Sequence, residues 1–351
     1  MLSPRHKKAK LILKDGQQFS GFSFGSPRSI SGEVVFNTGM VGYVESLTDP
    51  SYAGQILVLT YPLIGNYGVP SPIFFESRKI QVQGLIVSEL SGTMSHADAK
   101  TTLHEWLARS DVPGIFGVDT RALTKKLREK GVMLGKIKTE GSTDVPLWDP
   151  NKENLVAKVS VTKPVTYKGG KKRVIAIDCG VKEESIRLFL ARGVTVKKVP
   201  WDYDFTKEKF DGLFISNGPG DPVMCKKTIQ NIKKTMKLGK PIFGICLGMQ
   251  LMALATGAKT YKLKYGHRAQ NQPVREVGTN RCYVTSQNHG FAVNTKTLGK
   301  EWKPWFMNLN DNTLEGIRHA TKPWYSVQFH PEASPGPKDT EELFNRFVKD
   351  L

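Results

Sequence analysis

The sequence has few cysteines and no long apolar run. Four of its 351 residues are cysteine, and no two of them form a C-x-x-C pair: they are Cys179, Cys225, Cys246 and Cys282. This wide spacing argues against a zinc knuckle and against a disulfide framework, so we expect reduced thiols. No apolar stretch approaches the ~20 residues of a membrane helix, and residues 1–16 lack the apolar segment of a secretory signal. These absences predict a cytoplasmic chain that does not contact a membrane.

Motifs that bind nucleotides or nucleic acids are also absent. The chain has no G-K-[ST] motif, no G-x-G-x-x-G motif, and no interleaved aromatic and basic residues of the kind found in RNA-recognition sheets. It is nevertheless strongly basic, with 51 Lys and Arg against 32 Asp and Glu and a formal net charge of +19. The lysines fall in short groups, such as Lys125-Lys126 and Lys233-Lys234, within stretches that resemble exposed helix faces. We therefore expect a solvated basic surface and no specific nucleic-acid partner, with a nucleic-acid binder as an alternative.

Length and composition fit a globular protein with two domains. Hydrophobic residues make up 39% and charged residues 24% of the chain, as in ordinary globular proteins. Between residues 11 and 137, short β-rich runs alternate with Gly, Pro, Asp and Asn turns, and one helix is expected over residues 120–131. The predicted division is a β-rich mixed α/β domain over residues 1–162, a polar, lysine-rich linker over residues 163–172, and a second domain over residues 173–351.

Residues 173–351 show a different order of elements: strand, glycine, helix. Their apolar runs are continuous rather than alternating, which is typical of parallel strands buried on both faces. The predicted fold class is therefore α/β, with an open, mostly parallel sheet covered by helices on both faces and joined to the β-rich domain. Strands are expected within residues 173–180, 194–200, 212–222 and 241–248, with a helix within residues 182–193.

Cys246 lies where an apolar strand turns into a helix, between Gly244 and Gly248 in a G-x-C-x-G context. Such glycines permit a tight turn that presents the side chain at the carboxyl end of the sheet, as in a nucleophile elbow. The helix N-terminus would stabilise a thiolate, and its first N–H groups, beginning at Leu247, could donate to an oxyanion. A buried inert thiol is the alternative, because small residues near a strand end also serve packing. A nucleophile at this position needs a base.

His330 is the candidate base. It follows an apolar run in YSVQFHPE, and Glu332 stands two residues later, with Pro331 between them. Positions i and i+2 of an extended chain point the same way, so the Glu332 carboxylate could reach the imidazole and fix its tautomer. The other imidazole nitrogen could then take the thiol proton and protonate the leaving group. An isolated H-P-E favours a surface histidine, but a cysteine elbow in the same domain favours catalysis.

The segment SNGPGDP, residues 216–222, forms a glycine loop at the end of an expected strand. A phosphate-binding loop is disfavoured because Val223 stands where a third glycine would be required. The backbone N–H groups of this loop could instead complete an oxyanion hole opposite Leu247. A simple turn explains the pattern equally well.

Several long motifs resemble the class I, or triad, glutamine amidotransferases. Residues 32–68 and 117–131 further resemble the amino-terminal domain of the small, glutamine-hydrolysing subunit of carbamoyl phosphate synthetase, and the resemblance runs from about residue 11 to residue 351 in the family's order. The amidotransferase motifs are SNGPGDP, FGICLGMQLMALATGAKT, TSQNHGFAV and FHPEASPGP, and the amino-terminal ones are GEVVFNTGMVGYVESLTDPSYAGQILVLTYPLIGNYG and GVDTRALTKKLREKG.

The resemblance implies that Cys246, His330 and Glu332 form a triad that hydrolyses L-glutamine through a glutamyl thioester. It implies as partner a large synthetase subunit, which receives ammonia through a tunnel and makes carbamoyl phosphate from bicarbonate and ATP for pyrimidine and arginine biosynthesis. ATP and a divalent metal are expected in that subunit, and no cofactor or metal is expected in this chain. The glutamine-binding residues implied by the matching motifs are Ser51, Gly218, Gly220, Leu247, Gln250, Asn288, Gly290 and Phe291.

Three other interpretations stay open, and the first is the non-enzymatic nucleic-acid binder, which would explain the charge but not the elbow or the H-P-E motif. An amidotransferase that serves a different synthetase should lack the amino-terminal domain, which is present here. A different cysteine hydrolase could use the same triad, and only a substrate test with glutamine excludes it. Some relatives have lost the nucleophile and depend on free ammonia, but Cys246 argues that this chain has not.

Overall fold

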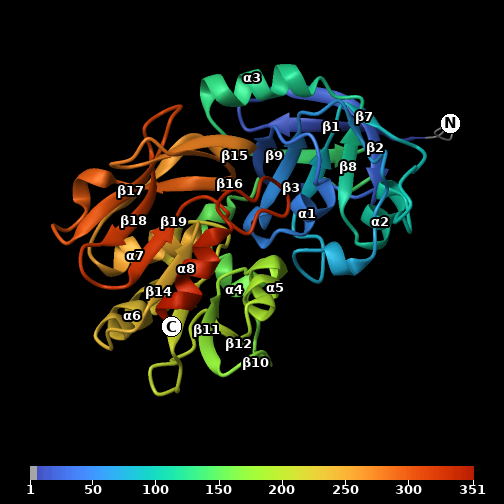
Figure 1. Cartoon of the computed structure of the whole chain (residues 1–351). Helices are drawn as coiled ribbons and strands as arrows, with labels where there is room; N and C mark the ends of the chain where they lie inside the picture. The colour runs from blue at the N-terminus through green and yellow to red at the C-terminus, as the bar shows by residue number, and fades with distance from the viewer. Residues whose placement is uncertain (1–5) are drawn as a thin grey trace. The chain divides into compact units, whose positions relative to one another are not determined.

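The computed structural model describes residues 6–351, which divide into two compact units (Figure 1). The first unit ends at Glu153, and the second runs from Asn154 to Leu351. Each unit has its own hydrophobic cores. The chain therefore has the two-part organisation that its length suggests.

The division between the units falls earlier than residue 162, where the sequence pattern places the end of the first domain. Val156, in the short helix α4 (Val156–Val159), is fully buried in a core of the second unit. Within the expected linker, β10 (Val165–Tyr167) pairs antiparallel with β12 (Val194–Pro200). Tertiary packing thus recruits polar segments that look like a linker in the sequence.

The first unit is built on a closed, seven-stranded barrel. Its strands are neighbours in the order β1-β2-β8-β6-β4-β3-β9, and β3, β4, β6 and β8 run parallel. The predicted β-rich character is confirmed, whereas closure depends on the pairing of β1 with β9, which no local pattern reveals. The barrel strands are β1 (Lys8–Leu13), β2 (Gln18–Gly25), β3 (Ile30–Asn37), β4 (Gln55–Leu59), β6 (Gly84–Ile86), β8 (Pro113–Phe116) and β9 (Met133–Thr139).

The predicted helix of the first unit is α3 (Thr120–Lys130). The Asp119 side chain accepts a hydrogen bond from the Ala122 N–H at its start, and Leu123 and Leu127 face the barrel core. An N-cap carboxylate and a buried stripe at i, i+4 explain why this segment is helical. The remaining elements of this unit are α1 (Tyr43–Thr48), α2 (Leu103–Arg109), β5 (Leu63–Ile64), β7 (Glu89–Leu90), and the 3-10 turns η1 (Pro50–Tyr52), η2 (Pro72–Phe74) and η3 (Pro150–Lys152).

The second unit is built on a ten-stranded sheet with the order β10-β12-β11-β13-β14-β19-β18-β17-β15-β16. The run from β12 to β19 is parallel, as predicted, and an antiparallel part extends it beyond β19. The parallel strands other than β12 are β11 (Lys172–Asp178), β13 (Gly212–Ile215), β14 (Ile242–Ile245) and β19 (Trp324–Val327), and the antiparallel ones are β15 (Thr260–Glu276), β16 (Cys282–Val293), β17 (Trp302–Asn308) and β18 (Leu314–His319).

Helices cover both faces of the parallel strands, which confirms the predicted α/β class. Val174 and Ala176 of β11 pack in the core that contains α5 (Glu183–Ala191) and α8 (Glu342–Asp350). The alternate residues Ile175 and Ile177 pack in the core that contains α6 (Lys226–Met236) and α7 (Leu247–Ala255). This alternation places the two helix pairs on opposite faces. The remaining turns are η4 (Pro222–Met224) and η5 (Thr295–Thr297).

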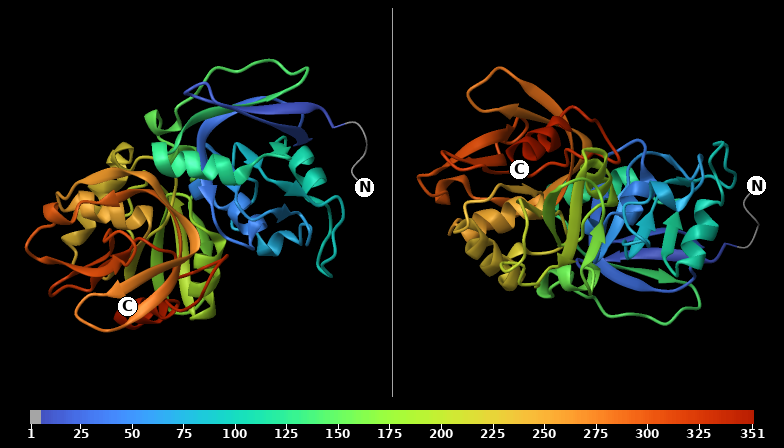
Figure 2. Two further views of the ribbon diagram at one scale, coloured as in Figure 1. Left: turned by 90° about the horizontal axis from the view of Figure 1, so that it is seen from above. Right: turned by 60° about the horizontal axis from the view of Figure 1, so that its bottom comes forward.

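The antiparallel hairpin β15–β16 is long and curved, as the orange ribbon in Figure 2 shows. Its pairing register shifts between Lys262 and His267 and again between Ala269 and Gln272. Such bulges bend a strand and redirect its side chains. As a result, inward and outward side chains do not alternate evenly along the hairpin, and several consecutive polar side chains are buried.

In the part of the chain that the structure describes, residues 6–351, no helix is both long enough and apolar enough to cross a bilayer.

Candidate functional site

Cys246 sits at a sharp turn between β14 and α7, as the sequence predicts. Its side chain is 2% exposed, and its backbone has φ 54° and ψ −107°, a region that non-glycine residues seldom adopt. Strain of this kind persists where the surrounding structure holds a residue in place. Because α7 begins at Leu247, the first N–H groups of the helix lack partners within the helix and lie next to the thiol.

Gly244 and Gly248 flank the thiol because the chain packs too closely there for any side chain. A Cβ at Gly248 would overlap the Ile215 carbonyl oxygen of the neighbouring strand β13. A Cβ at Gly244 would lie 2.9 Å from the backbone of Gly248. The two glycines thus serve helix-to-strand packing, while Cys246 itself adopts the positive φ.

We expect Gly248→Ala to lower the free energy of unfolding by roughly 2 kcal/mol or more, because the added methyl group overlaps backbone. The matched control is Gly299→Ala, where the nearest atom to an added Cβ is Cδ1 of Trp302 at 3.8 Å. That variant should change the free energy of unfolding by no more than about 0.5 kcal/mol. Urea unfolding of both variants measures the difference, and equal unfolding midpoints would contradict the packing role assigned to Gly248.

His330 and Glu332 lie together in the second unit and are almost fully buried. Their side chains approach to 2.6 Å between Nδ1 and Oε1. The i, i+2 spacing predicts this contact for an extended chain, but the Ala333 N–H donates to the His330 carbonyl, so residues 330–333 form a β-turn. The predicted contact is present, and a turn rather than a strand produces it.

Lys182 is a third buried ionisable residue beside His330 and Glu332, and no sequence motif identifies it. It lies just before α5, and its Nζ is 3.7 Å from Oε1 of Glu332 and donates to the Ala333 carbonyl. The lysine side chain is 3% exposed. The only local signal is its position shortly after the end of β11, because residues 182 and 332 meet only through the fold.

Burial and charge oppose each other in this group. Burial alone would lower the pKa of His330, but the charge of Glu332 and the Cys246 side chain outweigh it and raise that pKa to about 10. Burial alone would raise the pKa of Glu332, but the charges of His330 and Lys182 hold it below its usual value. At neutral pH the arrangement therefore favours an imidazolium between a carboxylate and the sulfur.

The second nitrogen of His330 is available for chemistry. Within residues 6–351, Nε2 of His330 is buried and has no hydrogen-bond partner. The Cys246 sulfur lies 3.7 Å from the backbone oxygen of Asn288. Proton transfer to and from a substrate at the sulfur requires a nitrogen that is free to exchange protons. Nε2 of His330 is buried and unpartnered, and the charge state of this histidine is influenced by Cys246, so Nε2 meets that requirement.

The structure brings several of the glutamine-binding candidates close to Cys246. Leu247 follows it directly, and a Cβ at Gly218 would touch both Leu247 and the Cys179 carbonyl, so the loop after β13 meets the start of α7. Asn288 contacts the Cys246 sulfur through its backbone oxygen.

The glutamine-binding roles of all eight candidates stay predictions, and the structure places the remaining ones as follows. Gln250 on α7 donates to the Phe291 carbonyl at 2.8 Å, which holds the helix against β16. Gly290 precedes Phe291 on that strand, and Gly220 packs near Leu155. Ser51 belongs to the first unit, in η1, where its N–H bonds to the Asp49 carboxylate.

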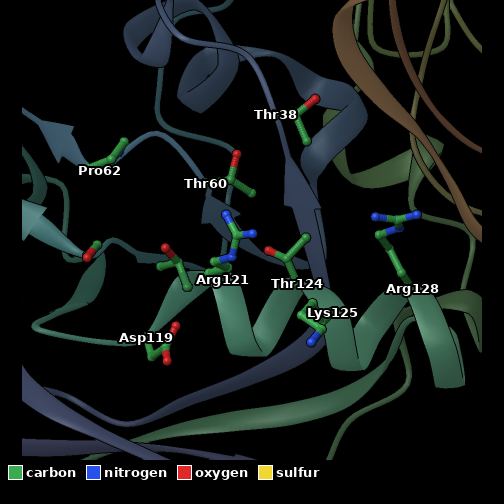
Figure 3. A pocket seen from close by; sticks show the side chains of 10 residues that line it. Thr38, Thr60, Pro62, Asp119, Arg121, Thr124, Lys125 and Arg128 are labelled. Atoms are coloured by element: carbon green, nitrogen blue, oxygen red, sulfur yellow. The ribbon is translucent and has the colours of Figure 1, made fainter.

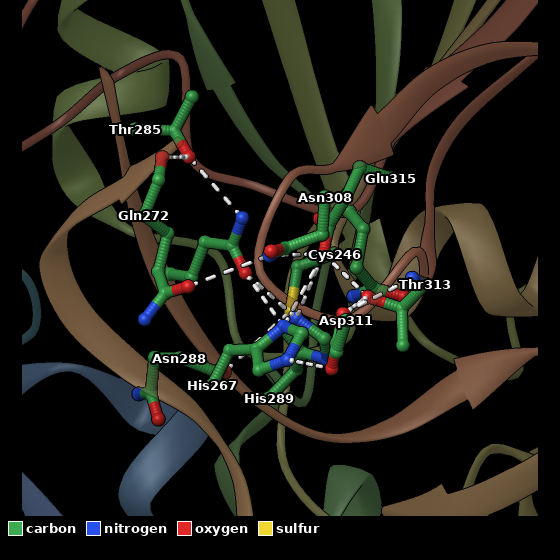
Figure 4. A network of polar contacts seen from close by, with 12 residues as sticks. Cys246, His267, Gln272, Thr285, Asn288, His289, Asn308, Asp311, Thr313 and Glu315 are labelled. Carbon is green, nitrogen blue, oxygen red and sulfur yellow. Dashed lines mark hydrogen bonds and ion pairs between the residues drawn. The ribbon is translucent and has the colours of Figure 1, made fainter. Parts of the chain in front are cut away.

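A polar network lies beside Asn288 in the hairpin β15–β16 and the start of β18 (Figure 4). Its central residues are His267, His289 and Glu315, which are buried and whose ligand atoms lie within 4.8 Å of one another. No local sequence pattern identifies His267 or Glu315, because these residues meet only when the bulged strands pair.

A separate cavity of about 680 Å³ lies in the first unit (Figure 3). Arg121, Lys125 and Arg128 of α3 line it on one side, and Thr38 and Thr60 line it at the ends of β3 and β4. Among the described residues that line it there is no cysteine or histidine. It therefore offers a basic surface but no nucleophile and base.

We expect this basic surface to bind duplex DNA weakly, with an affinity that falls steeply as salt rises, because such binding releases counterions. Fluorescence anisotropy at about 50 and 200 mM salt measures the slope. A variant with glutamine at positions 121, 125 and 128 should reduce that slope. Tight, sequence-selective binding at physiological salt would overturn this prediction and revive the nucleic-acid alternative.

Comparison with known proteins assigns both units. Residues 175–350 match the model for "Glutamine amidotransferase class-I", and residues 11–137 match "Carbamoyl-phosphate synthase small chain, CPSase domain". The two matches together span most of the chain. Each match lies within one of the two units that the structure separates.

Curated relatives align with almost the whole chain. The chain is 51% identical to "Multifunctional protein CAD" of Squalus acanthias, over 97% of this chain and 16% of that protein. It is 49% identical to "Multifunctional protein URA2" of Saccharomyces cerevisiae, over 99% of this chain and 18% of that protein. It is also 49% identical to "Carbamoyl-phosphate synthase [ammonia], mitochondrial" of Mus musculus, over 99% of this chain and 24% of that protein. The chain thus spans less than a quarter of the length of each of these relatives. It belongs to the class I glutamine amidotransferases, in the group that carries the carbamoyl-phosphate synthase small-chain domain.

Proposed function

We propose that this chain hydrolyses L-glutamine to glutamate and ammonia. Cys246 acts as the nucleophile, His330 moves protons, and Glu332 orients His330. Two features carry the proposal. Cys246 lies at a sharp turn before α7, and Nδ1 of His330 is held by the buried Glu332 carboxylate at 2.6 Å. That is the set of roles that a cysteine hydrolase needs.

In the first half of the reaction, the Cys246 thiolate, whose proton has passed to His330, attacks the side-chain amide carbon of glutamine. The first N–H groups of α7 stabilise the resulting oxyanion. His330, which carries a proton at neutral pH, gives it to the amide nitrogen as the carbon–nitrogen bond breaks, and ammonia leaves. The product of this half is a glutamyl thioester on Cys246.

In the second half, His330 removes a proton from a water molecule that attacks the thioester carbon. The carbon–sulfur bond then breaks, and glutamate and the Cys246 sulfur are released. The contacts of Glu332 with Lys182 and with His330 can persist through both halves, so the site needs little rearrangement between them. The glutamine-binding candidates of the second unit would hold the substrate beside Cys246, and the role of Ser51, in the first unit, stays a prediction.

We also propose a synthetase partner for this activity. The ammonia would pass to a synthetase that makes carbamoyl phosphate from bicarbonate and ATP, for pyrimidine or arginine biosynthesis, with ATP and a divalent metal bound by that partner. The support is that each of the three relatives is a much longer protein, one of them named a carbamoyl-phosphate synthase. That name specifies ammonia, whereas Cys246 in this chain favours glutamine as the nitrogen source.

The proposed function predicts that the chain alone hydrolyses glutamine slowly and is accelerated by its synthetase. A displacement of about 1 Å at such a site can change a rate by roughly 10²-fold, so contacts with a partner suffice to control it. The experiment measures glutamate and ammonia release with and without a carbamoyl phosphate synthetase large chain, ATP and bicarbonate.

Equal release of glutamate and ammonia from glutamine, with none from asparagine, would support a glutaminase over another cysteine hydrolase. If the chain alone already reaches the full rate of the mixture, its site is preassembled and the idea of partner control is wrong. If no glutamate forms under any condition, the proposed hydrolysis itself is wrong.

A further inference from the structure

Another cavity, of about 560 Å³, lies in the second unit at the amino end of β19, between β17, β18 and α8 (Figure 1). Its lining includes four cationic side chains: Lys303 of β17, Arg318 of β18, Lys322 just before β19, and Arg346 of α8. Among the described residues that line it, Asp350 at the end of α8 supplies the one carboxylate. The fold thus brings a net positive charge to one hollow.

Lys303, Arg318 and Tyr325 form a row across the sheet. Lys303 is paired directly with Arg318 between β17 and β18, and Arg318 with Tyr325 between β18 and β19. Side chains directly opposite each other on antiparallel strands share one face of the sheet, with Cβ atoms about 5 Å apart. Tyr325 packs in the same core as Phe344 and Phe347 of α8, so the row lies on the face that α8 covers.

Arg346 faces the same hollow from the helix. Its guanidinium lies over the rings of Trp305 and Tyr325, 5.0 and 5.2 Å from their centroids. Stacking of this kind holds a guanidinium in place and leaves the N–H groups at its edge able to donate. Because Tyr325 is the cross-strand neighbour of Arg318, the two arginines approach the hollow from the sheet and from the helix.

The four cations of this cavity have no anionic partner in the described part of the chain. Within residues 6–351, none of their side chains makes an ion pair or a hydrogen bond. The Asp350 carboxylate accepts a hydrogen bond from the Tyr325 hydroxyl at 3.0 Å, so its charge offsets only part of theirs. Like charges directly opposite each other on neighbouring strands destabilise a sheet. The pairing of Lys303 with Arg318 is therefore unfavourable for the fold alone, and a bound anion would relieve it.

The loop before β19 is shaped by His319. The backbone N–H groups of Thr321 and Lys322 donate to Nδ1 of His319 at 3.2 and 3.1 Å. Nδ1 therefore offers a lone pair, so the ring is neutral and its proton is on Nε2, which lies 3.4 Å from the Glu301 carboxylate. The His319 ring packs against Trp324 with centroids 5.0 Å apart. His319 thus positions Lys322 at the cavity without adding a charge.

We propose that this cavity binds the phosphate chain of a small di- or triphosphate. Each guanidinium group can donate to two oxygens of a phosphoryl group, and the two ammonium groups act as point charges. A single phosphoryl group would engage only some of the four cations, whereas consecutive phosphoryl groups can contact all of them. A volume of about 560 Å³ is typical of small-molecule sites. The sequence contains no nucleotide-binding motif because these side chains come from separate elements.

This cavity is separate from the proposed glutaminase site. It lies at the amino end of β19, whereas the Cys246 N–H bonds to the Val327 carbonyl at the carboxyl end of that strand. A strand of four residues is about 13 Å long. None of the residues that line the cavity is a candidate for catalysis or glutamine binding. Binding of a phosphate chain here therefore does not depend on the proposed function.

The test is calorimetric titration of the full chain with inorganic triphosphate, at about 0.15 M salt and without divalent metal. We expect saturable binding that Cys246→Ser retains. Inorganic phosphate and citrate should bind at least about 10-fold more weakly, because neither presents consecutive phosphoryl groups. If ATP binds more tightly than inorganic triphosphate, the ligand is a nucleotide, and equal binding means that the phosphate chain alone is recognised. Citrate that binds as tightly as triphosphate would contradict the proposed ligand.

Substitution of the cross-strand pair decides the assignment. Arg318→Glu should weaken triphosphate binding by roughly 10- to 100-fold. It should not lower the unfolding temperature of the ligand-free chain, because it places a carboxylate opposite Lys303. The matched control is Lys138→Glu, because Lys138 is directly opposite Lys10 in the barrel and the substitution changes the net charge equally. Lys138→Glu should keep the binding. If Arg318→Glu does not fold, Arg318→Gln gives the same comparison.

Three outcomes would overturn the proposal. Without saturable triphosphate binding, the four cations are a solvated basic surface. An equal loss of binding in Arg318→Glu and Lys138→Glu would mean that net charge, not this cavity, attracts the anion. The variant with glutamine at positions 121, 125 and 128 should keep the binding. If that variant loses it while Arg318→Glu retains it, the phosphate chain binds in the cavity of the first unit instead.

Discussion

Replacing Cys246 with serine should abolish glutamine hydrolysis while leaving the fold intact. A hydroxyl differs little from a thiol in volume, so the packing of this residue, which is 2% exposed, should survive. Near neutral pH, however, a serine hydroxyl supplies almost no alkoxide, so glutamine is not attacked and His330 has no leaving group to protonate. We expect the rate of glutamate release to fall by roughly 10³-fold or more.

The control for this variant is Cys282→Ser, at an exposed cysteine at the start of β16. It should keep the full rate, because Cys282 lies outside the proposed site. Mass spectrometry of the unaltered chain mixed with glutamine should show a glutamyl adduct on Cys246, and none in Cys246→Ser. Glutamate release by Cys246→Ser at the unaltered rate would mean that another group is the nucleophile.

The elbow could be predicted from the sequence because its determinants are local. An apolar strand, two glycines and a helix follow one another within residues 241–257, so no knowledge of the fold is needed to place Cys246 at the turn. His330 and Glu332 were also predictable as a pair, since they are two residues apart. The β-turn that joins them was not, because the Ala333 N–H could equally have continued a strand.

The remainder of the site depends on tertiary structure. Lys182 reaches Glu332 only because β11 and the turn after β19 end at the same side of the sheet. The network of His267 and Glu315 depends on two register shifts in β15. Likewise, closure of the barrel depends on pairing between its first and last strands. Periodicity indicates the type of an element, but pairing and register are set by contacts between distant segments.

Replacing His330 with asparagine should reduce glutamine hydrolysis far more than replacing Glu332 with glutamine. His330 transfers a proton in both halves of the reaction, whereas Glu332 only orients and stabilises the ring. On the precedent of other triads, the loss in His330→Asn should exceed that in Glu332→Gln by roughly 10²-fold. Steady-state glutamate release by both purified variants, each checked for folding by circular dichroism, measures the ratio.

The pH dependence of the free energy of unfolding gives an independent test of the roles of His330 and Glu332. The pKa of His330 in the folded chain is about 10, above its ordinary value of 6.5, so protonated His330 stabilises the fold fully below about pH 6.5. That contribution is lost as pH rises through about 10. The excess stability of the unaltered chain over His330→Asn should therefore shrink between these pH values. In Glu332→Gln the loss should occur at lower pH, because the charge that raises the pKa is gone. Equal losses of rate in the two variants, together with an unshifted pH profile in Glu332→Gln, would show that Glu332 does not act through His330.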